Sequence, residues 1–161
     1  MNYEDMSHCQ LGVIKVDLPP DVEHASAVPR LVSALQGTKI IQVECGAYHT
    51  LALTADKEVY SWGMGSAGRL GHGSEDDEML PRRIESLRNC NIVSIAAGYD
   101  HSAAVSAEGR LWMWGSGEWH QLGTGDKSKV LKPTVIKIEC NVKQVSCGGE
   151  YFNFLILIFK G

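Results

Sequence analysis

The sequence predicts an all-β protein built from a repeated unit of about four short strands. Three observations lead to this prediction. A long segment recurs at a fixed spacing, short runs of bulky apolar residues alternate with turn-forming segments, and the one helix-like stretch is not helix-like in the other copies of the repeat.

The repeat is clearest around the first of two histidine motifs. Gly46 to Leu53, with the sequence GAYHTLAL, recurs 52 positions later as Gly98 to Val105, with the sequence GYDHSAAV. A weaker third copy begins at Gly148, where Tyr151 takes the place of the histidine. A partial first copy is expected around Leu11. Other landmarks keep the same spacing, namely His49 with His101, Trp62 with Trp114, Gly63 with Gly115, Gly71 with Gly123, and Pro29 with Pro81 and Pro133.

Within a repeat, apolar and aromatic runs predict strands. Ile40–Val43 and Ile92–Ile95 form one predicted strand of each copy, and Val59–Trp62 and Leu111–Trp114 form another. The segments TADKE and SAEGR separate the latter from a preceding apolar run, as hairpin turns would.

The only helix-like stretch is Leu31 to Gln36. Its repeat partners, Arg83 to Arg88 and Thr134 to Lys137, look extended. We therefore expect an extended segment there as well.

A period near 50 residues with glycine-marked turns is typical of a β-propeller blade. The chain divides into a partial first repeat with an insertion (1–42), two complete repeats (43–94 and 95–144), and the start of a further repeat with a divergent apolar tail (145–161). The expected fold is thus an incomplete propeller of about two full blades with partial blades at each end.

Composition excludes several functional classes. The chain has 161 residues and a net charge of −4, which argues against a direct nucleic-acid binder. Its five cysteines include no C-x-x-C pair, and there is no signal peptide, so reduced thiols in the cytosol or nucleus are expected. The most apolar run, Phe152 to Phe159, is too short to span a membrane and predicts a strand or core segment.

A G-x-G-x-x-G motif at Gly63, Gly65 and Gly68 raises the question of a nucleotide site. Two further glycines follow within five residues and do not open a helix, and the second repeat has His120 at the third glycine position. We therefore interpret the glycines as structural, allowing positive φ between strands, and expect no bound cofactor and no small-molecule substrate.

The histidines and cysteines also favour structural roles. His49 and His101 share one repeat position with Tyr151, which indicates packed rings bonded to a neighbouring turn and not a proton shuttle. A second repeat position is occupied by Cys45, Ala97 and Cys147. Because alanine is tolerated there, we expect a small, buried side chain at this position. Trp62 and Trp114 are expected in the core between blades. No zinc spacing or catalytic set is present, so no enzymatic activity is expected of this chain.

These motifs resemble the regulator of chromosome condensation repeat. Val43 to Gly73 and Ile95 to Gly125 resemble its unit over nearly their whole length. The resemblance implies a propeller of about seven blades, so the chain is expected to be a fragment, a truncated isoform or an incomplete gene model of a larger protein. It also implies guanine-nucleotide exchange on a small GTPase, chromatin binding, or scaffolding in larger proteins such as HECT-type ubiquitin ligases and kinases.

Positions where the repeats disagree are the candidates for partner binding. Trp119 aligns with Ala67 and is not required by the repeat. The loop after Gly73 is acidic and the loop after Gly125 is basic, which is typical either of solvated loops or of docking of a charged partner. The candidate residues are Glu75, Asp76, Asp77, Glu78, Trp119, His120, Lys127 and Lys129.

The predicted function is that of a non-catalytic protein-interaction or scaffold module, within a ubiquitin-pathway protein. The alternative is an exchange factor for a Ran-like GTPase or a chromatin-binding regulator. Because the apolar tail resembles segments that self-associate, the isolated chain is also expected to form oligomers or aggregates.

Overall fold

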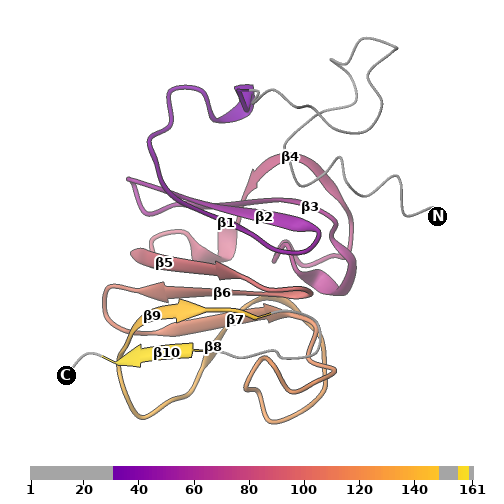
Figure 1. Cartoon of the computed structure of the whole chain (residues 1–161), viewed down its shortest axis with the longest axis vertical. Coiled ribbons are helices and arrows are strands. Elements are labelled where there is room, and N and C mark those ends of the chain that lie inside the picture. Colours follow the sequence, from indigo (N-terminus) through magenta and orange to yellow (C-terminus); the bar gives the residue numbers. More distant parts are fainter. Residues whose placement is uncertain (1–30, 149–155, 160–161) are drawn as a thin grey trace.

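The predicted all-β fold is confirmed by the structure, a computed structural model that describes residues 31–148 and the backbone of residues 156–159. Three antiparallel sheets stack one upon another (Figure 1). We call the first two sheets the first and second blades. The first blade is β1 (Ile40–Cys45), β2 (His49–Thr54), β3 (Val59–Gly63) and β4 (Glu78–Arg83), the second is β5 (Ile92–Ala97), β6 (His101–Ser106), β7 (Leu111–Gly115) and β8 (Val130–Ile136), and the third sheet pairs β9 (Val142–Ser146) with β10 (Ile156–Phe159).

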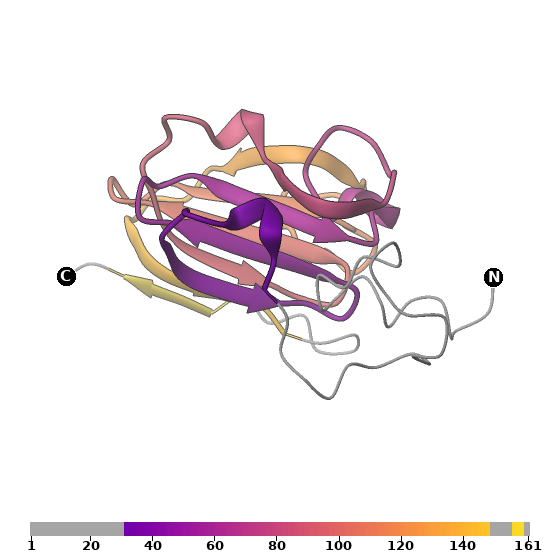
Figure 2. The ribbon, with the colours of Figure 1, turned by 90° about the horizontal axis from the view of Figure 1, so that it is seen from above.

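Both blades follow the simple strand order expected of consecutive hairpins. β1 lies beside β5, and β5 beside β9, so these strands form the inner row of the stack, while β4 and β8 are the outer edges. Figure 2, seen from above, shows the sheets lying over one another with a stagger. The structure therefore has the architecture of a partial propeller.

Two apolar clusters hold the sheets together. The first lies between the blades and joins Leu51 and Leu53 of β2 to Ile95 and Trp114. The second joins Met113 and other second-blade residues to β9. Every residue of β2 and of β6 is buried, because a central strand of a stacked sheet is covered on both faces.

The connection between blades corrects one expectation. Ser33–Leu35 and Glu85–Leu87 form short 3₁₀ turns, so the extended conformation expected for Leu31–Gln36 is wrong. The chain must reverse from an outer strand to the next inner strand, and the turn does this while burying Leu87 against Ile84. The third copy, in contrast, is extended as far as Ile136, within β8.

The predicted hairpin turns join β2 to β3 and β6 to β7. Gly109 adopts a φ of +85° in the second turn, and Lys57 has a φ of +66° in the first. The first turn therefore places a side chain in a conformation that favours glycine.

The apolar tail is partly described. β10 confirms a strand at residues 156–159, whereas Leu11, Pro29 and Tyr151 lie outside the described residues. In the part of the chain that the structure describes, no helix is long and apolar enough to cross a membrane.

Candidate partner-binding rim

One end of the stacked sheets carries every candidate binding residue except Glu78. The loops from β1 to β2 and from β3 to β4 meet at this end, and so do the equivalent loops of the second blade. We call this end, formed by residues 46–48, 64–77, 98–100 and 116–129, the loop rim. The hairpin turns at residues 55–58 and 107–110 form the opposite rim.

Trp119 is the most prominent apolar side chain of the loop rim. It is 69% exposed, whereas its counterpart Ala67 is half-buried. Its backbone is fixed, because the Trp119 N–H donates to Oε1 of the buried Gln121 at 2.8 Å. The next residue, His120, is exposed and has a φ of +58°. A large apolar surface is thus presented on an ordered loop.

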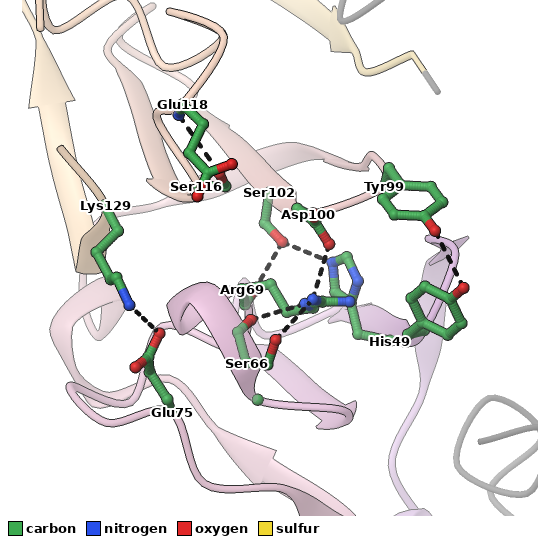
Figure 3. Close-up of polar contacts among 12 residues, drawn as sticks. His49, Ser66, Arg69, Glu75, Tyr99, Asp100, Ser102, Ser116, Glu118 and Lys129 are labelled. Atoms are coloured by element: carbon green, nitrogen blue, oxygen red, sulfur yellow. Dashed lines mark hydrogen bonds and ion pairs between the residues drawn. The ribbon is translucent and has the colours of Figure 1, made fainter. Parts of the chain in front are cut away.

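The acidic and basic loops lie side by side and are joined across the blades. Lys129 Nζ donates to Glu75 Oε1 at 2.7 Å (Figure 3). Asp77 has a structural contact, since its Oδ1 accepts the Gly65 N–H at 2.8 Å. Asp76 and Lys127 are exposed.

Glu78, which was expected in the acidic loop, begins β4 instead and forms an ion pair with Arg82. Of the charged candidates, Asp76 and Lys127 have no side-chain partner within the described residues.

A buried arginine lies beneath the rim, and sequence reasoning missed it. The Arg69 side chain is 4% exposed, pairs with Asp100 Oδ1 at 2.7 Å and donates to the carbonyl of Ser66 at 2.8 Å. Its guanidinium lies over the Tyr48 ring, 5.6 Å from the centroid. Its counterpart in the second blade is Gln121, so this departure from the repeat was the available signal.

The Arg69 carbonyl ties the first blade to the second. It accepts hydrogen bonds from Ser102 Oγ at 2.9 Å and from Trp114 Nε1 at 2.8 Å. Because the single Ser102 proton is used there, Ser102 Oγ must accept from His49 Nε2, 2.7 Å away. His49 is therefore the Nε2–H tautomer, and Figure 3 shows the chain of contacts from His49 through Ser102 to Arg69.

Both repeated histidines are enclosed and neutral. Burial and the nearby Arg69 charge lower the pKa of His49 to about 3, and burial lowers the pKa of His101 to about 4. His49 bonds to a strand of the next blade, whereas a turn was expected. Neither ring is placed to exchange protons with a substrate near neutral pH.

The cysteine position does not fit the expected small and buried site. Cys45 is exposed, so the expectation is wrong there, and Ala97 and Cys147 are only partly buried. All three line a hollow of about 260 Å³ on the loop rim. Burial raises the pKa of the Cys147 thiol to about 12, which makes it a poor nucleophile.

The glycine motif at Gly63 serves close packing and turning. Gly63 and Gly68 have φ of +111° and +77°, and Gly65 has ordinary φ but lies against the Asp76 carbonyl with no room for a Cβ. The motif opens only a 3₁₀ turn at Ser66–Gly68 and no phosphate-binding helix. Among the described residues, no group of three potential ligands could hold a metal ion.

The sequence comparisons agree with this geometry. Residues 7–53, 56–105 and 108–155 match the family described as "Regulator of chromosome condensation (RCC1) repeat", and residues 40–69 and 92–120 match a second description of the same repeat. The chain belongs to the RCC1 repeat family. The resemblance suggested by the repeated motifs is thereby confirmed.

Curated relatives of this RCC1-repeat chain are larger proteins. It is 41% identical over 138 residues to the human E3 ubiquitin-protein ligase HERC2, and 38% identical over 125 residues to the ultraviolet-B receptor UVR8 of Arabidopsis thaliana. These matches cover 83% and 76% of this chain. The chain spans only 3% of HERC2 and 28% of UVR8.

Solved RCC1-type structures share the fold. Human WBSCR16 aligns with a TM-score of 0.70 and 31% identity over 82% of this chain and 34% of its own. Prp20p from Saccharomyces cerevisiae, described with its binding properties to Gsp1p and histones, aligns with a TM-score of 0.69 and 25% identity over 91% of this chain and 36% of its own. Together these relatives support an RCC1 propeller module that works in protein interaction.

Proposed function

We propose that the chain is a non-catalytic recognition module that binds a protein partner through its loop rim. The observation that carries this proposal is Trp119, an exposed aromatic side chain on an ordered loop that the repeat does not require. Exposed aromatic residues beside polar ones are typical of interface anchors. The charged loops beside it supply selectivity.

Site-specific photocrosslinking in cells tests which rim binds. A photoreactive phenylalanine analogue is placed at Trp119, and in a control variant at Asp56 on the opposite rim. Both positions are exposed. We expect a discrete adduct from position 119 only, reduced at least fivefold when Lys127 and Lys129 are changed to alanine. Equal adducts from both rims, or none from position 119, would contradict the proposal.

We further propose that the module belongs to a ubiquitin-pathway protein. This is supported by the similarity to HERC2 and to human HERC3, named a probable E3 ubiquitin-protein ligase and 39% identical over 132 residues. The test is whether the crosslinked adducts at position 119 contain ubiquitin-pathway proteins, identified by mass spectrometry. Adducts that contain none would contradict this assignment.

The second candidate function is nucleotide exchange on a Ran-like GTPase. The similarity to Prp20p, described with its binding to Gsp1p, favours it. A nucleotide-release assay against a panel of GTPases measures this directly. Release no faster than the spontaneous rate would remove the exchange function and leave the recognition module intact.

Self-association of the isolated chain is also proposed. Ile41 and Val43 on β1 are 48% and 52% exposed, whereas Ile95, the second-blade counterpart of Val43, is 1% exposed because it packs on the first blade. A half-exposed apolar inner strand favours association. Sedimentation velocity should show oligomers whose population falls in V43E, and a monodisperse monomer would contradict this.

A further inference from the structure

The outer wall between the two blades contains a hollow of about 310 Å³, which shares only the Gly71–His72 segment with the loop rim. Its floor is the Gly71–His72 segment, and its walls are Arg82 and Arg83 of β4 and Lys132 of β8. Three cationic side chains from two blades thus line one concave site.

The blade fold does not require these cations. In the second blade, Thr134 and Val135 stand where the first has Arg82 and Arg83. In the first blade, the counterpart of Lys132 is Leu80. The hollow is therefore a particular feature of this junction, as Trp119 is of the loop rim.

The three cations differ in how firmly they are held. Arg83 is fixed by two carboxylates, with Nη1 at 2.7 Å from Glu58 and Nε at 2.8 Å from Glu85. Within the described residues, Arg82, whose side chain is 54% exposed, pairs only with Glu78. A partly exposed pair of that kind adds little to stability, so an incoming anion can recruit Arg82 at little cost.

Lys132 is the cation without a partner. Its ammonium makes no ion pair or hydrogen bond within the described residues, although its aliphatic chain is held against Gly73. The Gly73 N–H donates to the Leu131 carbonyl at 2.9 Å, which fixes the loop to β8 beside it. Lys132 is exposed, so its ammonium is available to an incoming anion.

The floor is also ordered. Ser61 Oγ donates to the Leu70 carbonyl at 2.8 Å, so His72 Nε2, 2.9 Å away, must donate to Ser61. The imidazole is thereby locked against the blade. Of the residues that line the hollow, only Glu85 is acidic, and it is engaged with Arg83.

We propose that this hollow binds a phosphoserine or phosphothreonine side chain of a peptide. A phosphate ester carries a charge of about −1.5 to −2 and offers three acceptor oxygens, which suits one free ammonium and one recruitable guanidinium. The hollow is also small enough to be filled by one phosphorylated side chain, and too small to hold an extended protein surface.

Calorimetric titration of the whole chain with short peptides tests this. Three peptides of alanine and glycine carry phosphoserine, glutamate or serine at the centre, and inorganic phosphate is a fourth probe. We expect the phosphoserine peptide to bind at least tenfold more tightly than the other three probes. Lys132→Ala should weaken its binding about tenfold and Arg82→Ala about fivefold.

Lys143→Ala is the matched control, because it removes an exposed lysine of β9, outside both the hollow and the loop rim. We expect it to change the affinity by less than twofold. Equal binding of the serine or glutamate peptide, equal binding of inorganic phosphate, or equal losses in Lys143→Ala and Lys132→Ala would each overturn the proposal. Unaltered binding of the phosphoserine peptide by Lys132→Ala would also overturn the proposal. The melting temperature of each variant is measured as well, and an unchanged value excludes misfolding as the cause of weaker binding.

Discussion

The two blades share one backbone and differ in what they present to their surroundings. In both, the histidine of the second strand pairs with the glycine that ends the third, His49 with Gly63 and His101 with Gly115. Both inner strands also have a register shift at the same place. The pairing of strands is thus set by repeated residues.

The differences lie at the loops and outer strands. Arg69 faces the second blade as a buried cation, whereas the second blade has the neutral Gln121 in its place. Ala67 is replaced by Trp119, and Arg82 by Thr134. Repeated positions therefore maintain the fold, and unrepeated positions are free to serve the junction between blades or a partner.

The largest effect should come from breaking a repeated position. Trp114 is fully buried in the cluster between blades and also donates a hydrogen bond to Arg69. Trp114→Ala should lower the free energy of unfolding by about 4 kcal/mol. Trp119→Ala, the unrepeated tryptophan, should change it by less than about 0.5 kcal/mol. Urea unfolding measures both, and equal losses would erase the distinction between the two kinds of position.

The next effect concerns acid stability. In the unfolded chain, His49 and His101 have the ordinary pKa of 6.5. In the folded chain the pKa is about 3 for His49 and about 4 for His101. Stability should therefore fall as the pH is lowered from 7.5 to 5.5, by roughly 1.4 kcal/mol for each histidine. The exposed Glu85, whose pKa is lowered by its bond to Arg83, loses its contribution only below about pH 4.5.

Urea unfolding at several pH values measures this dependence. His101→Gln should reduce the fall in stability between pH 7.5 and 5.5 by roughly 1.4 kcal/mol. A stability that stays constant between pH 7.5 and 5.5 would contradict the burial of neutral histidines.

The repeat explains why much of the fold was predictable and why part of the rim was not. The strands around Trp62 and Trp114 could be predicted, because the same pattern of apolar residues occurs at equivalent positions in both copies of the repeat. The Arg69 network could not, because it joins residues 33 and 45 positions apart on different blades. The 3₁₀ turn at Ser33–Leu35 was missed because both repeat partners looked extended in the sequence, although Glu85–Leu87 within the first of them forms the same turn.

A smaller effect should follow from making the first blade resemble the second at Arg69. Arg69→Gln removes the guanidinium from Asp100, whose side chain is 34% exposed, and leaves both backbone bonds to the Arg69 carbonyl possible. We expect a loss of about 2 kcal/mol, less than for a fully buried pair, because water can still reach Asp100. In a cycle with Asp100→Asn, a coupling energy near zero would show that the ion pair adds nothing.

The smallest effect is expected at the pair that joins the two charged loops. Lys129 and Glu75 are 56% and 42% exposed, so their attraction is screened, and holding two long side chains together costs entropy. Glu75→Gln and Lys129→Ala should each leave the urea midpoint of unfolding unchanged within error, in dilute buffer as in 0.5 M salt. A clear drop in the midpoint of either variant would mean that the loops hold the blades together. An unchanged midpoint leaves both residues available to a partner, because breaking their mutual contact then costs almost nothing.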